Sequence, residues 1–284
     1  MGVRARRSAV LSKLSMWTSF FIDLSPEGAL EELARAGWHH AELSDEHSRA
    51  LLERGAPDLV GEAFRRFADD AGVAVTQGHL WLTVDIAPAS EPARRQAIEG
   101  LKPWLDLYLA VGIWAAVIHP GGAAHTDPAA RLDEQLRSLD ELASHVRGSD
   151  LVLCLENCSS GEALKPLLAA TQPTEVGVCL DTGHLNLTPE SQGAFIRFCR
   201  RRLEALHLAE NDRTGDQHNL PFARGGCVPW DEVAAALADV RYDGLLNFEV
   251  PGENRCPLPV RRLKLAYLKN LAGWIFGERR SEES

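Results

Sequence analysis

Carboxylate and imidazole side chains follow apolar runs at four successive places in the second half of this 284-residue chain. They are Glu156 in LVLCLEN, Asp181 in EVGVCLD, His207 in LEALHLAE and Glu249 in GLLNFEV. An unpaired charge beside a buried apolar run is costly, and a bound divalent cation would offset that cost. Three carboxylates and one imidazole suit Mn²⁺, Mg²⁺, Co²⁺ or Zn²⁺. The pattern therefore predicts a metal site with these four residues as its ligands.

Further polar residues occur in the same kind of position and extend the set of possible ligands. They are His79 in TQGHLW, His119 in VIHPGG, His184 in CLDTGH, and Asp216 and His218 in GDQHNLP. A single histidine after a strand is more often a hydrogen-bonded structural residue, and a single carboxylate there is more often a helix cap. The joint pattern favours a metal centre, so these five residues are possible extra metal ligands.

Eight short apolar runs, rich in β-branched and aromatic residues, predict buried parallel strands. They cover 14–21, 39–44, 73–80, 113–120, 151–157, 175–181, 203–210 and 244–250. Amphipathic patterns typical of helices alternate with them, at 25–37, 57–72, 91–112, 127–146, 161–170, 191–201, 229–240 and 257–275. Dividing 284 residues by eight gives about 35 residues per unit, the size of a βα repeat. The alternation predicts the α/β class and a single (β/α)8 TIM barrel.

The barrel is expected over 14–275 as one domain, between a disordered basic leader at 1–13 and a disordered tail at 276–284. No GxGxxG motif follows the first strand, so we expect no nucleotide cofactor. The active sites of such barrels lie at the carboxyl ends of the strands. The polar residues named above are therefore expected to converge at that end.

The composition argues against two classes of binding partner, nucleic acids and membranes. The chain has 30 basic and 40 acidic residues, a net charge of −10, which argues against binding nucleic acid through the phosphate backbone. Its six cysteines include no CxxC pair, which is typical of reduced thiols in a cytoplasmic protein. No apolar run reaches the about 18 residues of a membrane span, so we expect no membrane partner.

Six short motifs carry a resemblance to a known superfamily. They are LEN at 155–157, CLDTGH at 179–184, LHLAEND at 206–212, HNLP at 218–221, PWDEV at 229–233 and NFEV at 247–250. Together they resemble the xylose-isomerase-like TIM-barrel superfamily, which contains sugar isomerases, sugar 3-epimerases, inosose dehydratases, hydroxypyruvate isomerases and the endonuclease IV branch. The resemblance extends over residues 14–275. The motifs are specific for the superfamily and do not single out one member.

In the ketose 3-epimerase branch, the resemblance implies one divalent metal at positions matching Glu156, Asp181, His207 and Glu249. It implies that Glu156 and Glu249 also act as the acid and the base, through a metal-stabilised enediolate. The implied substrate contacts are His184, Arg213, Glu162, His119 and His79. Taken alone, Glu162 is equally consistent with a first-turn helix carboxylate, and Arg213 with a charge on the rim.

The endonuclease IV branch uses three zinc ions, and its ligand types are also present. The resemblance places His79, His119 and Glu156 at the first ion. It places Glu156, Asp181, His207 and Glu249 at the second ion, and His184, Asp216 and His218 at the third. Because sugar-acting relatives keep several of these histidines too, the histidines do not separate the two branches.

Charge favours a small sugar or polyol over DNA as the substrate, because the expected strand-end loops lack Arg and Lys clusters. The leading hypothesis is a metal-dependent sugar or polyol isomerase or epimerase, and the alternative is a trinuclear-zinc phosphodiesterase on abasic DNA. A third hypothesis, a catalytically silent metal-binding barrel, is disfavoured by the presence of both Glu156 and Glu249. Barrels of this type commonly form homodimers or homotetramers, and we expect the same here.

Overall fold

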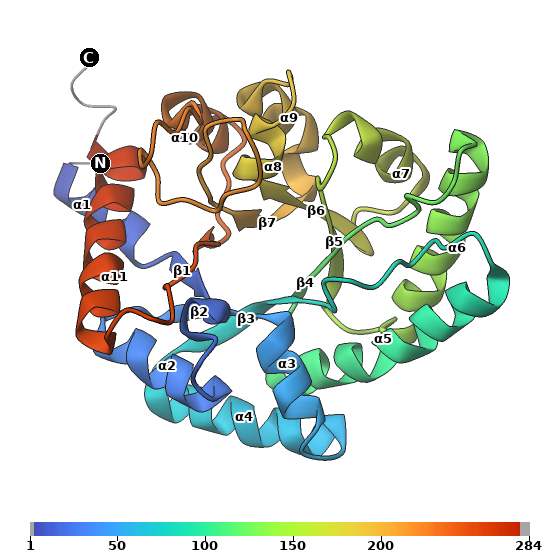
Figure 1. Cartoon of the computed structure of the whole chain (residues 1–284), viewed down its shortest axis with the longest axis horizontal. Coiled ribbons are helices and arrows are strands. Elements are labelled where there is room, and N and C mark those ends of the chain that lie inside the picture. Colours follow the sequence, from blue (N-terminus) through green and yellow to red (C-terminus); the bar gives the residue numbers. More distant parts are fainter. Residues whose placement is uncertain (1–2, 279–284) are drawn as a thin grey trace.

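A ring of eight parallel strands surrounded by helices forms the fold (Figure 1) in the computed structural model, which describes residues 3–278. The strands are β1 (Leu14–Trp17), β2 (His40–Leu43), β3 (Ala74–His79), β4 (Ala115–Ile118), β5 (Val152–Glu156), β6 (Val176–Asp181), β7 (Leu203–His207) and β8 (Leu246–Phe248). They pair in the order β7-β6-β5-β4-β3-β2-β1-β8. The single (β/α)8 TIM barrel expected from the sequence is therefore confirmed.

The ring closes between β7 and β8 just beyond the end of β7. The Leu208 amide donates to the Asn247 carbonyl oxygen at 2.9 Å, and the Glu249 amide donates to the Leu208 carbonyl oxygen at 3.2 Å. A parallel bridge between Leu208 and Phe248 accompanies these bonds. Every other pair of neighbouring strands is in register over at least three residues. The β7–β8 seam is therefore the shortest pairing in the barrel.

Helices cover the outside of the ring (Figure 1). They are α1 (Val3–Leu11), α2 (Pro26–Arg35), α3 (Asp45–Leu52), α4 (Pro57–Ala71), α5 (Glu91–Val111), α6 (Pro128–His145), α7 (Lys165–Ala170), α8 (Thr182–Asn186), α9 (Gln192–Cys199), α10 (Trp230–Asp239) and α11 (Leu258–Gly273). Shorter turns are η1 (Thr18–Phe21), η2 (Glu162–Leu164), η3 (Arg200–Arg202) and η4 (Trp274–Glu278). Ser25 and Ser90 cap the first turns of α2 and α5, and Gly112, at φ 93°, ends α5 in the left-handed conformation.

Residues 3–11 form helix α1, so the prediction of a disordered leader over 1–13 is wrong for these residues. The helix packs against α11 and η4 (Figure 1). Val10 and Leu11 are partly buried against the main core, which gives this basic segment a reason to fold. Of the predicted disordered tail, residues 276–278 lie in η4. Residues 279–284, like residues 1–2, lie outside the described part of the chain.

The first strand is shorter than its predicted range of 14–21. It ends at Trp17, and the next four residues form the buried turn η1. Thr18 explains the turn, because its Oγ1 accepts a hydrogen bond from the Ser44 amide at 2.9 Å and ties η1 to the end of β2. Ser44 also caps α3, a helix that the sequence pattern did not predict.

The main apolar core lies between the strands and the helices, and a second cluster of small side chains lies within the sheet. That cluster consists of Ala115, Val117, Cys154, Cys179 and Ala205. None of the helices within residues 3–278 combines the length and the apolar character needed to span a lipid bilayer.

Gly252, in the segment after β8, offers a test of how tightly this end of the barrel is packed. A Cβ at this position would lie 1.9 Å from the carbonyl oxygen of Phe20. Gly252→Ala should therefore displace the segment and lower the free energy of unfolding by about 1–3 kcal/mol. Gly100→Ala in α5 is the control, because its Cβ would meet nothing within 4 Å and alanine favours a helix by about 1 kcal/mol. Denaturant unfolding measures both variants, and equal stabilities would contradict the steric account.

Candidate metal centre

Four strands bring the four predicted metal ligands to one buried point at the carboxyl end of the barrel. Glu156, Asp181 and His207 are the last residues of β5, β6 and β7, and Glu249 follows β8 directly. One ligand atom from each residue lies within 4.8 Å of the others. In that order their exposed fractions are 1%, 0%, 0% and 4%. The structure therefore brings together the ligand set chosen from the sequence and removes it from bulk water.

His207 has a fixed orientation within this group. Its Nε2 lies 3.0 Å from Glu42 Oε1, and because an ionised carboxylate only accepts, Nε2 carries the proton. Its Nδ1 faces Glu249 Oε2 at 3.2 Å and Glu156 Oε2 at 3.5 Å. A neutral imidazole would direct a lone pair at these carboxylates. The arrangement therefore requires either a second proton on His207 or a cation between the side chains.

Three buried atoms of the group lack a hydrogen-bond partner among the described residues: Asp181 Oδ2, His207 Nδ1 and Glu249 Oε2. Leaving a buried polar atom unpaired costs on the order of 1–3 kcal/mol. One divalent cation would satisfy all three atoms. Carboxylate oxygens and one imidazole nitrogen are donors that Mn²⁺, Mg²⁺, Co²⁺ and Zn²⁺ accept. The residues present therefore fit the predicted cofactor.

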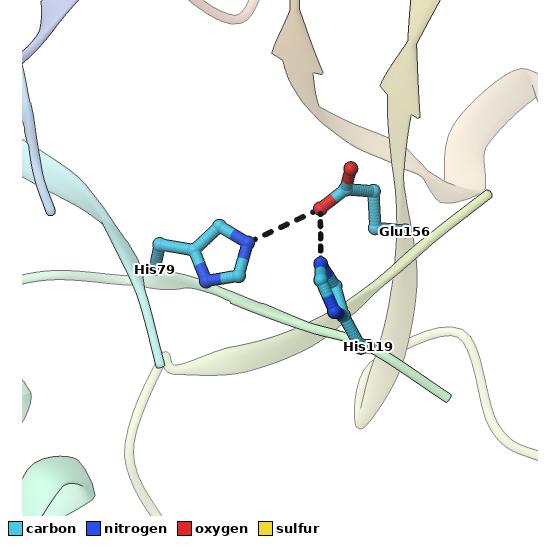
Figure 2. A group of neighbouring side chains, drawn as sticks. All are labelled: His79, His119 and Glu156. Atoms are coloured by element: carbon cyan, nitrogen blue, oxygen red, sulfur yellow. Dashed lines mark hydrogen bonds and ion pairs between the residues drawn. The ribbon is translucent and has the colours of Figure 1, made fainter. Parts of the chain in front are cut away.

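His79 and His119 form a second group with Glu156 (Figure 2). Both Nε2 atoms approach Glu156 Oε2, at 3.2 Å from His79 and 3.3 Å from His119. The Nδ1 of His79 lies 2.7 Å from the Leu80 carbonyl oxygen and therefore carries a proton. As in His207, the second nitrogen of the His79 ring faces a carboxylate.

His184, Asp216 and His218 form a third, more open group. The Nε2 atoms of His218 and His184 lie 3.0 and 3.1 Å from Asp216 Oδ2. His218 Nδ1 lies 3.0 Å from the Glu249 carbonyl oxygen, so its Nε2 is again the nitrogen that faces a carboxylate. His184 connects this group to the first, because its Nδ1 approaches Glu156 Oε1 at 2.9 Å.

Burial and charge shift the proton affinities of these side chains. Burial, with a further contribution from Glu156 and Glu249, raises the pKa of Asp181 to about 7. Burial also acts to raise the pKa of Glu249, but the charge and hydrogen bond of His207, together with the charge of His218, outweigh it and lower that pKa to about 2. Burial would lower the pKa of His79, yet Glu156 raises it to about 9. Protonated histidines thus supply positive charge to the carboxylates, and a metal ion that binds must displace those protons.

Two predicted substrate contacts lie outside the three groups. Glu162 begins η2, its side chain is 64% exposed, and it pairs with Lys165. Its amide donates to Glu190 Oε2 at 3.1 Å, which holds η2 against the loop before α9. Arg213 is exposed in the loop after β7, where its Nε donates to Asn186 Oδ1 at 3.4 Å. The other predicted contacts, His79, His119 and His184, belong to the ligand groups.

Glu42 is a positioning residue that the sequence analysis did not identify. It lies inside β2, is fully buried, and accepts hydrogen bonds from Gln77 Nε2 at 2.8 Å and from Asn247 Nδ2 as well as from His207. Histidines that bind metals commonly donate their second ring proton to a carboxylate, which fixes the orientation of the ring. The only local signal is in HAELS at 40–44, where a carboxylate interrupts an apolar run inside a strand.

Glu42→Gln should weaken metal binding by about 10–100-fold, because the amide no longer holds His207 with Nδ1 towards the ligand group. Titration of metal-free protein with Mn²⁺ or Zn²⁺ measures the affinity. Glu32→Gln is the control, since Glu32 is also a buried carboxylate but pairs with Arg262 at 2.7 Å between α2 and α11. An unchanged affinity in Glu42→Gln would rule out the positioning role.

Comparison with known proteins links the chain to one family. The family model described as "Xylose isomerase-like TIM barrel" matches residues 30–272. A D-psicose 3-epimerase of Enterocloster bolteae is 26% identical over 200 residues, which cover 65% of this chain and 64% of that protein. A probable endonuclease 4 of Nitratidesulfovibrio vulgaris strain DP4 is 27% identical over 165 residues, covering 55% of this chain and 58% of that protein. The chain thus spans less than two thirds of the length of these curated relatives.

A solved structure with the same architecture is D-psicose 3-epimerase with D-tagatose from Clostridium cellulolyticum H10. Its TM-score is 0.76, with 17% sequence identity, and the match covers 93% of this chain and 99% of that chain. At this identity, the likeness establishes the barrel fold alone.

Proposed function

Because this chain belongs to the xylose isomerase-like TIM-barrel family, we propose that it is a divalent-metal-dependent isomerase or epimerase of a small sugar or polyol. The observation that carries the proposal is the buried pair Glu156 and Glu249, which share His207 and lie beside the unpartnered oxygen of Asp181. Two carboxylates beside one metal-ligand set can remove a proton next to a carbonyl group and return it.

In the proposed reaction, one of the two carboxylates removes the proton from the carbon beside the substrate carbonyl. The electron pair of the broken C–H bond moves towards the carbonyl oxygen, which gives an enediolate. The other carboxyl group returns a proton, to the opposite face of the same carbon in an epimerase or to the neighbouring carbon in an isomerase. A bound divalent cation would supply the positive charge that stabilises the enediolate oxygens. Glu156 and Glu249 come from different strands, β5 and β8, which β6 and β7 separate in the closed ring, so the two carboxylates reach the centre from different directions.

A second function, phosphodiester hydrolysis by a trinuclear zinc centre, is favoured by a different observation. His79, His207 and His218 each keep one protonated nitrogen on an acceptor and turn the other towards a carboxylate, one histidine in each of the three groups. Metal-ligating histidines show this arrangement. The likeness to a probable endonuclease 4 agrees with it. The net charge of −10 weighs against DNA as the substrate and keeps this function second.

Metal content and substrate turnover together separate the two functions. Elemental analysis of protein purified without chelators should give one divalent metal per chain for the isomerase or epimerase, and three zinc ions for the phosphodiesterase. In parallel, a panel of ketoses in deuterated water is followed by NMR for exchange of the C3 proton, and an abasic-site duplex is assayed for cleavage. Exchange without cleavage supports the first function. Cleavage without exchange overturns it.

A further inference from the structure

Cys158 lies beside the ligand group, two residues after Glu156. Its Sγ, a ring nitrogen of His184 and a carboxylate oxygen of Glu156 all lie within 4.8 Å of one another. The thiol donates to the Glu156 carbonyl oxygen at 3.6 Å, and Cys158 is partly buried in the loop that follows β5. None of the functions considered above uses this side chain.

The side chains of Cys158, His184 and Glu156 can each donate an electron pair to a metal ion. Thiolate sulfur, imidazole nitrogen and carboxylate oxygen are the ligands of Zn²⁺, with Zn–S bonds of about 2.3 Å and Zn–N bonds of about 2.0–2.1 Å. These bond lengths place the ligand atoms of one ion within about 4 Å of one another, so binding would draw the three atoms slightly closer than the present limit of 4.8 Å. Mg²⁺ and Mn²⁺ prefer oxygen ligands and gain little from sulfur.

The ring nitrogen of His184 that faces this group is a second observation in favour of a bound ion. The Nδ1 atom is buried, and although it approaches Glu156 Oε1 at 2.9 Å, it makes no hydrogen bond among the described residues. The neighbouring Asp181 Oδ2 is buried and unpartnered as well. Burial, with the charges of Glu156 and Asp181, raises the pKa of the Cys158 thiol. A bound cation reverses this effect, because a coordinating thiol is deprotonated outright.

We propose that Cys158 is a metal ligand that acts with Glu156 and His184 and makes the centre selective for a thiophilic divalent cation such as Zn²⁺. On binding, the Sγ–H bond breaks, the sulfur electron pair binds the ion, and the proton leaves to solvent without any electron transfer. The inference concerns the choice of metal, so it holds whichever reaction the centre performs.

The other cysteines provide internal controls. Cys154, Cys179 and Cys199 are buried, Cys227 is exposed and Cys256 is partly buried. Cys256 resembles Cys158 most closely, because its Sγ also lies near a carboxylate, at 3.5 Å from Glu253 Oε2. Among the described residues, however, Cys158 is the cysteine that belongs to a ligand group.

The first test uses Co²⁺ as a spectroscopic substitute for Zn²⁺ in metal-free protein. A sulfur-to-cobalt charge-transfer band in the near ultraviolet should appear, disappear when Zn²⁺ is added, and be absent in Cys158→Ser but present in Cys256→Ser. In Cys158→Ser, the Zn²⁺ affinity should fall by at least about 10-fold, because losing a residue that only hydrogen-bonds to a metal ligand already costs about that much. The Mn²⁺ affinity should not change. A band that persists in Cys158→Ser would overturn the proposal.

The second test needs no variant and so does not depend on how a variant folds. Metal-free protein is alkylated with iodoacetamide, with and without Zn²⁺, and labelling is quantified for each cysteine-containing peptide by mass spectrometry. Zn²⁺ should protect Cys158 and leave the labelling of Cys227 unchanged. Equal labelling of Cys158 with and without Zn²⁺, at a concentration that saturates metal binding, would overturn the proposal.

Discussion

Glu249→Gln and Glu156→Gln should each lower kcat for sugar turnover by about 10²–10⁴-fold, the contribution typical of general acid–base catalysis. Glutamine keeps the size of the side chain and an oxygen that can bind a metal, but it neither accepts nor returns a proton at the pH of the assay. Steady-state kinetics with the ketose that shows the fastest C3 exchange measure the effect.

The control for these variants is Glu32→Gln, which removes a buried carboxylate from the contact between α2 and α11 and should leave kcat unchanged. Metal titration of each variant distinguishes lost proton transfer from lost metal. If Glu156→Gln or Glu249→Gln binds metal normally and turns over at the parent rate, the paired-carboxylate mechanism is wrong.

Removing the metal should lower Tm by about 5–10 °C. A ligand at 100 times its Kd that binds only the folded state stabilises it by about 2.7 kcal/mol. For a chain of this size, 1 kcal/mol corresponds to about 2–4 °C in Tm. The linkage applies here because the folded chain brings ligand atoms from four strands within 4.8 Å of one another. Scanning calorimetry with a chelator, and again after Mn²⁺ or Zn²⁺ is added back, measures the shift.

A variant that alters one of the four ligands shows whether the shift comes from this centre. In Asp181→Asn, one buried carboxylate loses its charge, so the chelator should change Tm much less than in the parent protein. Glu32→Gln should keep the full shift. A chelator that strips the metal, as elemental analysis would show, yet leaves Tm unchanged would exclude a stabilising metal at this site.

Strand ends and ligands were predictable together because of how a parallel barrel buries its strands. Each strand is covered on both faces, so its sequence is a nearly continuous apolar run. A polar residue at the end of such a run is therefore easy to recognise. The ranges 151–157 and 175–181 contain β5 and β6, with Glu156 and Asp181 as their last residues. The metal-ligand set could therefore be chosen before the structure was known, while its role stays a prediction.

Residues whose role depends on distant partners were not predictable in the same way. Glu42 lies in the middle of its strand, and its partners Gln77, His207 and Asn247 come from three other strands. No local sequence pattern predicts such a hydrogen-bond network. The place of Glu162 outside the ligand groups was not predictable for a related reason, because spacing fixes its distance along the chain from β5 but not the direction in which the loop leaves the barrel. Its contact with a substrate stays a prediction. Similarly, α1 packs against α11 and η4, which lie at the other end of the sequence.

The short β7–β8 seam has a consequence for how a metal ion would exchange. Local opening begins where backbone hydrogen bonds are fewest, and this seam is held near the centre by the two bonds of Leu208. When the seam opens, Glu249 moves away with the end of β8, while Glu156 and Asp181 remain on the continuous β5–β6 pairing. We therefore expect the centre to lose one ligand without global unfolding. The residence time of a bound ion would then depend on local opening of one strand pairing rather than on the stability of the whole barrel.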